Sequence, residues 1–123
     1  MSLARLQSIS RSEVMPQVEA FIRESQKVAR VKKIILFGSL ARNEMTLASD
    51  IDLAVLVDSK ENLQEIKEQL RAIKQRSMNW PCDLVVCDLE WFESRRDLGG
   101  ICFVIAREGQ VLFDRSQEGE EKR

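Results

Sequence analysis

Two periodicities of apolar residues run along the chain, and together they predict helices alternating with short strands. Apolar residues spaced by three and four between positions 13 and 27 predict a helix whose first turn tolerates Pro16. Asp58 and Ser59 are residues of the kind that cap helices, and the apolar stripe behind them predicts a helix to about Arg76. The other face of that helix is rich in Lys, Glu, Gln and Arg, which is typical of a solvated surface.

Four short apolar runs predict strands at 31–37, 51–57, 82–87 and 110–113. The run 51–57 is apolar on both faces, as expected of a central strand. The stretch 38–49 predicts a turn, a short helical piece and a loop. Helices and strands therefore alternate along the chain.

A last helix is predicted over 91–107, weakened by the glycine pair at 99–100 and ended by Gly109. On this helix, Trp91 and Phe92 could dock a partner, but aromatic side chains are more often buried in the core, and burial is expected for both.

The order of elements predicts an α/β (α+β) fold in which a small mixed sheet is flanked by helices. A chain of 123 residues has room for one domain, expected over 1–113. The remaining stretch 114–123 is too polar to pack and is predicted to be a disordered tail. No internal repeat or linker interrupts this single domain.

Composition narrows the function classes. The 19 Lys+Arg balance 20 Asp+Glu, which argues against a protein that grips long nucleic acid. No apolar run approaches the ~20 residues of a membrane span, and the first residues lack the core of a signal peptide, so a cytoplasmic protein is expected. The absence of His excludes a catalytic histidine and the common His-rich metal sites.

The three cysteines are expected to be reduced core thiols, because three thiols cannot all pair within one chain. Cys82 and Cys87 lie five residues apart on a predicted strand. An odd spacing sends their side chains to opposite faces, which excludes a shared zinc site.

Three acidic positions carry the candidate chemistry. Asp50 and Asp52 lie two apart at the start of a strand, so both face one side, roughly 7 Å apart along the chain. Like charges so close repel unless a cation lies between them, and Mg²⁺ is suited to oxygen ligands of this kind. Asp83, near the start of the next predicted strand, would add a third oxygen ligand and allow two ions to be held.

Gly38 and Ser39 follow a predicted strand, ten residues before the Asp-x-Asp pair. Gly38 allows the backbone to approach a ligand, and Ser39 begins a short helix whose free N–H groups attract phosphate. Taken alone, Gly-Ser is most often a turn and Asp-x-Asp a cap or solvated loop. An anion cradle beside metal-binding carboxylates is, in combination, the equipment for phosphoryl or nucleotidyl transfer.

With these motifs in place, the chain resembles the polymerase-β-like nucleotidyltransferase superfamily, and most closely its minimal nucleotidyltransferases (MNT proteins). The resemblance rests on ILFGSLARNEMTLASDIDLAVLV and CDLVV, and on the closing stretch ICFVIAREGQVLF. It therefore covers nearly the whole chain except the tail.

The resemblance implies roles for the individual residues. Gly38 and Ser39 would bind the triphosphate, Asp50 and Asp52 would be ligands of both Mg²⁺ ions, and Asp83 would hold the metal nearest the attacking hydroxyl. Near this site, Arg42 is the closest cation in sequence and could brace the phosphates, although an exposed helical Arg is an equally good interpretation. Asn43 stands where the family commonly has Gly, and Asn tolerates the positive φ that such a loop requires.

The activity implied is transfer of a nucleoside monophosphate, most often AMP from ATP as substrate, with pyrophosphate leaving. Proteins of this size and motif resemble the antitoxins of HEPN–MNT toxin–antitoxin pairs, which add AMP to a tyrosine of the HEPN toxin (AMPylation). Two alternatives stay open. One is a non-catalytic antitoxin or scaffold that binds its partner, and the other is a stand-alone transferase acting on a small hydroxylated molecule.

Overall fold

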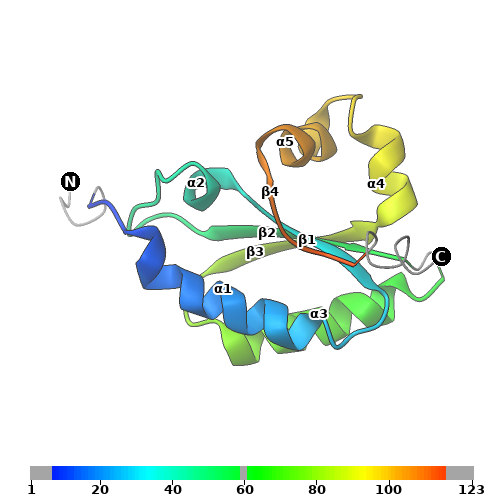
Figure 1. The fold of residues 1–123 in the computed structure, drawn as a ribbon, viewed down its shortest axis with the longest axis horizontal. Coiled ribbons are helices and arrows are strands. Elements are labelled where there is room, and N and C mark those ends of the chain that lie inside the picture. The colour runs from blue at the N-terminus through cyan, green and yellow to red at the C-terminus, as the bar shows by residue number, and fades with distance from the viewer. Residues whose placement is uncertain (1–6, 59–60, 116–123) are drawn as a thin grey trace.

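The apolar run 51–57 becomes an inner strand of a four-stranded mixed sheet in the computed structural model, which describes residues 7–58 and 61–115 (Figure 1). The strands lie in the order β3-β2-β1-β4. β1 is antiparallel to β2 and β4, whereas β3 is parallel to β2. This arrangement confirms the predicted mixed sheet. The strands are β1 (Val31–Phe37), β2 (Ile51–Val57), β3 (Cys82–Asp88) and β4 (Gln110–Asp114).

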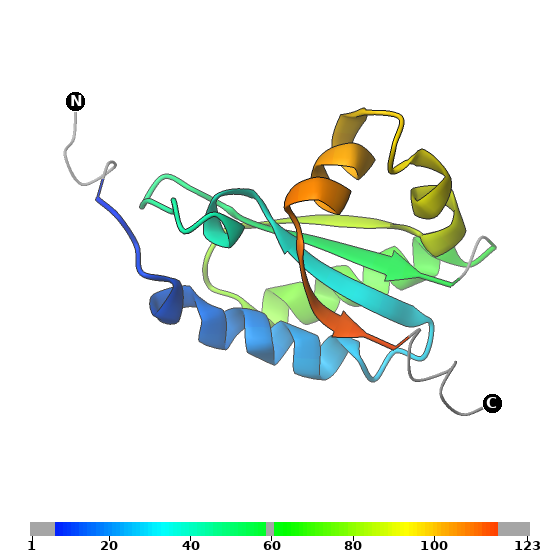
Figure 2. The same ribbon diagram turned by 45° about the horizontal axis from the view of Figure 1, so that its top comes forward.

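Helices cover both faces of the sheet, as Figures 1 and 2 show. α1 and α3 lie side by side against one face, and α4 and α5 lie on the other. The short α2 follows β1 directly. The helices are α1 (Arg11–Ser25), α2 (Gly38–Ala41), α3 (Leu63–Ser77), α4 (Leu89–Arg95) and α5 (Gly100–Glu108).

The alternation of side chains along β2 divides the core into two parts. Leu53 and Val55 are fully buried toward α1 and α3, where Phe21 and Leu70 join them. Ala54 and its neighbours on the same side of the sheet pack toward α4 and α5. Burying one such large apolar side chain contributes about 1.5–3 kcal/mol, so β2 is stabilised from both sides.

α1 begins two residues before the predicted start because Ser10 forms a capping box with Glu13. The Ser10 hydroxyl accepts a bond from the Ser12 N–H, and the Glu13 carboxylate accepts one from the Ser10 N–H at 2.7 Å. Pro16 consequently lies in the second turn of the helix, and its predicted place in the first turn is wrong.

α3 begins at Leu63, with Asn62 at its N-cap, so the predicted cap at Asp58 is wrong. The Asp58 N–H donates instead to the Arg30 carbonyl at 2.8 Å, and the Arg30 guanidinium donates to the Asp58 carbonyl at 3.0 Å. These bonds join Asp58 to the start of β1. Ser59, the other predicted cap, lies outside the described residues.

The helix predicted over 91–107 is two helices, α4 and α5. Gly99 and Gly100 separate them with φ of 97° and 73°, values that right-handed helix does not allow. Gly109 does end α5, but its φ of −73° requires no glycine. Glycine is needed there because a Cβ would collide with the Ile35 side chain and the Ile105 carbonyl.

β4 extends to Asp114, one residue beyond its predicted end, and the chain stays attached at Arg115. The Arg115 guanidinium donates to the carbonyls of Val28 and Ala29 at 3.1 and 2.8 Å, and also to that of Gln26. The rest of the predicted tail, 116–123, lies outside the described residues.

All three cysteines are free, as predicted. Cys82 packs with the α1/α3 core and Cys87 with the α4/α5 core, which confirms that they face opposite sides of the sheet. Phe92 is buried as expected, but the expectation for Trp91 is wrong because 44% of it is exposed. None of the described helices combines the length and apolar character needed to cross a membrane.

Candidate active site

Asp52 lies against the backbone of Gly38, at the point where β1 gives way to α2. It is paired with Phe37, the residue directly before that glycine. Gly38 has a φ of 76°, and a Cβ at this position would collide with Oδ2 of Asp52. Only glycine therefore allows the turn to pass so close to the carboxylate.

The parallel pairing of β2 and β3 places Asp83 in register with Asp52. Neighbouring strands lie about 4.8 Å apart, and paired residues point to the same face, so these carboxylates are side by side. Asp50 precedes Asp52 by two residues. Burial raises the pKa of Asp52 above its ordinary value, and the negative charges of Asp83 and Asp50 raise it further. The structure thus places Asp52 and Asp83 side by side at the open end of the sheet face that packs against α4 and α5, and Asp50 lies close enough to act on Asp52 electrostatically.

These residues fit a magnesium ion only together with its substrate. Within residues 7–58 and 61–115, no group of three or more Asp, Glu or Cys side chains is arranged to hold a metal by itself. Mg²⁺ typically binds through one or two carboxylates and completes its shell with water and substrate phosphates. Asp52 and Asp83 supply two such carboxylates. Their negative charges repel each other, and a bound divalent cation would relieve this repulsion.

The turn at Gly38 and Ser39 is short but well held. The Glu44 N–H donates to the Ser39 carbonyl at 2.8 Å, and the Arg42 N–H donates to the Gly38 carbonyl at 3.2 Å. Asn43 takes a φ of 59°, which confirms that Asn can replace glycine in this loop. Ser39 is half-buried. The role of the turn as a triphosphate cradle stays a prediction.

Arg42 is held by two carboxylates. Its guanidinium lies 2.8 Å from Glu44 and 2.8 Å from Glu108, and these contacts raise the pKa of Arg42. Its positive charge also lowers the pKa of Asp52, so it acts on the site electrostatically. Sequence reasoning missed Glu108, because a residue 66 positions away gives no local signal.

Lys74 is a second cation near the site that the sequence did not single out. Its ammonium donates to the Cys82 carbonyl at 3.1 Å, next to Asp83. Lys74 and Asp50 both line a pocket of about 480 Å³ beside Trp80, whose indole N–H donates to the Ser49 carbonyl. Lys74 reaches the start of β3 only because α3 packs there in the folded protein, so no sequence motif predicts this contact.

A comparison with known protein families identifies the family of this chain. A family model described as a nucleotidyltransferase domain matches residues 15–112. The chain belongs to this family. The match contains Gly38, Asp50, Asp52 and Asp83, the residues that form the site. A comparison with curated proteins found no match.

Solved structures of similar fold include members of the same broad class. A candidate nucleotidyltransferase from Sulfolobus solfataricus is similar with a TM-score of 0.59 and 17% identity, over 87% of this chain and 86% of that one. A toxin–antitoxin structure with AMP-PNP is similar with a TM-score of 0.50 and 24% identity, over 85% and 77% of the two chains. These likenesses confirm the nucleotidyltransferase fold.

A third structure contains a tri-AMPylated HEPN toxin of Shewanella oneidensis in complex with an MNT antitoxin. This chain is similar to it with 20% identity, over 90% of this chain and 78% of that one. The TM-score of this similarity is 0.45.

Proposed function

We propose that this nucleotidyltransferase-family protein moves AMP from ATP to a hydroxyl group, and that the acceptor is a tyrosine of a partner HEPN toxin. The observation that carries the proposal is the contact between Asp52 and Gly38, with Asp83 in register beside it. Because Gly38 has no side chain, the Asp52 carboxylate lies directly against the turn that would receive the phosphates, so a cation held by Asp52 could also contact them. The similarity to a toxin–antitoxin structure with AMP-PNP supports the choice of an adenine nucleotide and of a toxin as the partner.

Each residue has a distinct part in this reaction. The Gly38–Ser39 turn would receive the phosphates, while Asp50 and Asp52 would hold two Mg²⁺ ions together with Asp83. Magnesium, when bound, would neutralise the phosphate charge and lower the pKa of the acceptor hydroxyl. Asp83 lies at the exposed edge strand, where an incoming hydroxyl can reach it and pass its proton to the carboxylate.

In the proposed transfer, one bond to the α-phosphorus forms as another breaks. The deprotonated acceptor oxygen forms a bond to the α-phosphorus as the bond from that phosphorus to the bridging oxygen breaks. Pyrophosphate leaves opposite the incoming oxygen, and AMP stays on the acceptor. Because positioning and charge neutralisation supply most of such catalysis, a chain without histidine is adequate for it.

The test combines the protein with ATP, Mg²⁺ and the product of the neighbouring reading frame, followed by mass spectrometry. We expect the partner to gain the mass of AMP on a tyrosine. Asp83→Asn should lower this rate by about 10²–10⁴-fold, since it removes the group that receives the proton. Asp97→Asn, which changes an exposed carboxylate away from the site, is the matched control and should leave the rate unchanged.

Two results would contradict the proposal. Partner inhibition that persists in Asp83→Asn with no AMP transferred would indicate a binding antitoxin. AMP transfer to a small hydroxylated metabolite, with no protein acceptor required, would indicate a stand-alone transferase.

A further inference from the structure

β3 is one of the two outer strands of the sheet, and within residues 7–58 and 61–115 only β2 pairs with it, which leaves its other side open for pairing. The Cys82 carbonyl faces this side, where Lys74 donates to it, while the Pro81 carbonyl faces β2 and accepts from Ile51. Because backbone groups alternate along a strand, the N–H and C=O groups of Leu84 and Val86 point outward with Cys82. They form an unpaired strand edge, which is a template for another strand.

Concave surfaces follow this edge from one end to the other. A cleft of about 670 Å³ at the α4 end shares Val86 and Lys67 with a second hollow of about 320 Å³. That hollow in turn shares Lys74 with the pocket that contains Asp50. Together they form one band, here called the β3 groove, about 20 Å long because β3 has seven residues.

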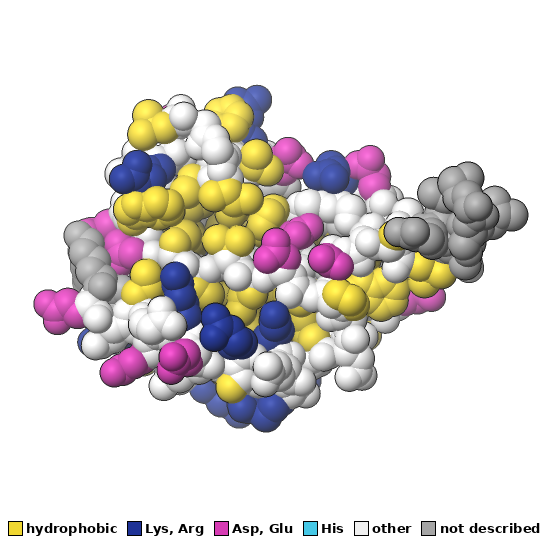
Figure 3. All heavy atoms as spheres, turned by 180° about the vertical axis from the view of Figure 1, so that it is seen from behind, with side chains coloured by type: hydrophobic (Ala, Val, Ile, Leu, Met, Phe, Trp, Pro, Cys, Tyr) yellow, Lys and Arg dark blue, Asp and Glu magenta, His cyan; other side chains and the backbone are white. Residues whose placement is uncertain are grey.

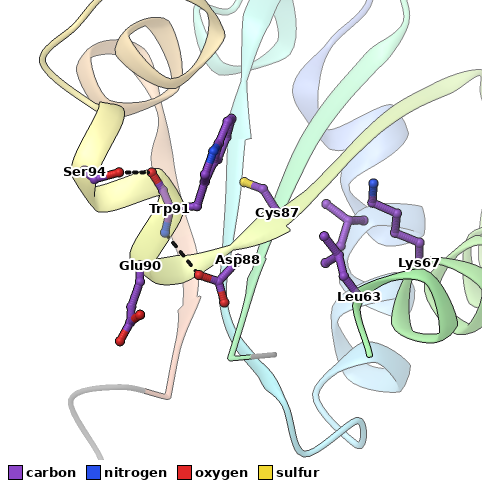
Figure 4. Close-up of a pocket in the computed structure, with 8 residues that line it drawn as sticks. Leu63, Lys67, Cys87, Asp88, Glu90, Trp91 and Ser94 are labelled. Atoms are coloured by element: carbon purple, nitrogen blue, oxygen red, sulfur yellow. Dashed lines mark hydrogen bonds between the residues drawn. The ribbon is translucent and has the colours of Figure 1, made fainter. Parts of the chain in front are cut away.

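The cleft at the α4 end of the β3 groove has a mostly apolar surface, with charged side chains such as Asp88 and Lys67 at its rim. Figure 4 shows Trp91 on α4 and Leu63 on α3 on opposite sides of β3, with Cys87 between them. Arg95 stacks on the Trp91 ring at 4.8 Å, which holds the indole in place. Trp91 remains 44% exposed, as the largest apolar side chain in the cleft.

The middle of the β3 groove is basic. Lys67, Arg71 and Lys74 follow one another at helical spacing on the side of α3 that lines the second hollow. In the described part of the chain, neither Lys67 nor Arg71 forms an ion pair. In Figure 3, Lys and Arg side chains form a row below a patch of hydrophobic ones on this side of the molecule. Carboxylates lie toward the two ends, at Asp50 and at Asp88.

We propose that the β3 groove binds an extended segment of the acceptor protein as an added β-strand, with acidic side chains against Lys67 and Arg71 and an apolar one against Trp91. This inference rests on the proposed function. Strand addition uses the unpaired backbone for affinity and alternate side chains for specificity. The acidic side chains would face α3 and the apolar ones α4. The far end of the segment would reach the pocket lined by Asp50 and Cys82, directly beside Asp83, where the acceptor hydroxyl is needed.

Other occupants fit the β3 groove less well. In a two-fold pairing of two β3 edges, the basic rows of both copies would face each other, so like charges oppose a second copy of this chain. A single-stranded RNA would find cations and one aromatic ring, but the chain has a net charge of −1 and carboxylates close both ends of the groove.

The test uses synthetic peptides as long as β3, without ATP or metal, so it does not depend on AMP transfer. The first has Glu alternating with Val in its middle and Leu at one end. The second has the same composition with Glu moved to both ends. We expect the first to bind more tightly, and to slow hydrogen exchange at the amides of Leu84 and Val86 but not at that of Val85, which pairs with β2.

Variants separate the two parts of the interaction. Lys67→Glu with Arg71→Glu should weaken binding of the first peptide about tenfold, with a loss that shrinks at high salt. Arg76→Glu, on the same helix but outside the groove, is the matched control and should bind normally. N-methylation of the peptide on its pairing edge should abolish binding, while N-methylation on the other edge should not.

Several results would overturn the proposal. Equal binding of both N-methylated peptides would exclude strand addition. Binding of oligo-uridine in place of the peptide, lost in the double variant, would assign the groove to RNA. Self-association that Val86→Arg abolishes would assign it to a second copy. Normal peptide binding without any AMP transfer would contradict only the proposed function, and the assignment of the β3 groove as a strand-binding site would stand.

Discussion

The two faces of the sheet differ in how completely helices cover them. α1 and α3, of 15 residues each, cover one face along its length, and the residues of β2 that point to it are fully buried. α4 and α5 have 7 and 9 residues and cover only part of the other face. The uncovered part is where Asp52 and Asp83 lie.

Because of this difference, one face of the sheet mainly stabilises the fold and the other carries the candidate active site. A fully covered face can hold only apolar side chains, because a buried charge without a partner is costly. The partly covered face keeps carboxylates at the start of β2 and β3 within reach of water and ligand. The complete core on one side thus permits a strained, repelling cluster on the other.

The largest effect is expected from the helices that cover each face. Leu70→Ala on α3 removes a fully buried side chain and should lower the free energy of unfolding by about 3 kcal/mol. Leu89→Ala on α4 removes a half-buried one and should cost about 1 kcal/mol. Urea denaturation measures both. Equal losses would show that the two faces contribute alike.

A second comparison concerns two glycines in left-handed conformations. Gly38→Ala suffers both the strain of a φ of 76° and a collision with Asp52, and should lose about 2 kcal/mol of stability together with ATP binding. Gly100→Ala has a similar φ of 73° but open space around its Cβ. It should show the strain alone, about 1 kcal/mol, with ATP binding kept. Calorimetry of unfolding and of ATP binding would separate the two.

A smaller effect of opposite sign is expected at Asp52. Burial and the charges of Asp83 and Asp50 disfavour its carboxylate and raise its pKa, so Asp52→Asn should stabilise the metal-free protein at pH 7. Because Asp52 is only partly buried and solvent screens its charge, the gain should stay below about 1 kcal/mol. Adding Mg²⁺ with a nucleotide should narrow this difference in stability, because in the proposed function both would bind the folded wild type and stabilise it. Asp97→Asn is the neutral control for melting temperatures.

The smallest effect on stability near neutral pH is expected at Cys87, which lies on the partly covered face of the sheet. Burial, mainly, raises its pKa from 9.0 to about 12. The folded state therefore retains the thiol proton more strongly than the unfolded state, and stability should fall as pH rises from 9 through 12. Cys87→Ser should flatten this decline. At pH 8, iodoacetamide should alkylate Cys87 much more slowly in the folded protein than in urea, and equal rates would contradict the burial argument.

Local patterns were enough to predict most of the fold. Strands β1 and β2 have their predicted bounds, because short β-branched runs flanked by turn residues allow few alternatives. Asp50 and Asp52 were found because they lie two residues apart at the start of a predicted strand, and the positive φ of Asn43 could be predicted because Asn tolerates it at a position where the resembling family has Gly. Each of these features could be predicted from a residue and its immediate neighbours in the sequence.

What the sequence did not predict depends on long-range contacts. The start of α3 was misplaced because Asp58 bonds to Arg30, 28 residues earlier. Arg42 is held by Glu108 from the far end of α5. Trp91 was expected in the core, but α4 is too short to bury all sides of so large a ring. No local pattern carries such information.

The register between β2 and β3 has a consequence for how this protein can be studied. A slip of a single position would replace Asp83 by Leu84 beside Asp52 and turn the acid to the opposite surface. Such a misfolded chain would retain its helices and its circular dichroism spectrum, but it would lose the magnesium-nucleotide binding that we propose. If the proposed function holds, a nucleotide-binding assay would therefore report on correct strand alignment after refolding, which circular dichroism does not detect.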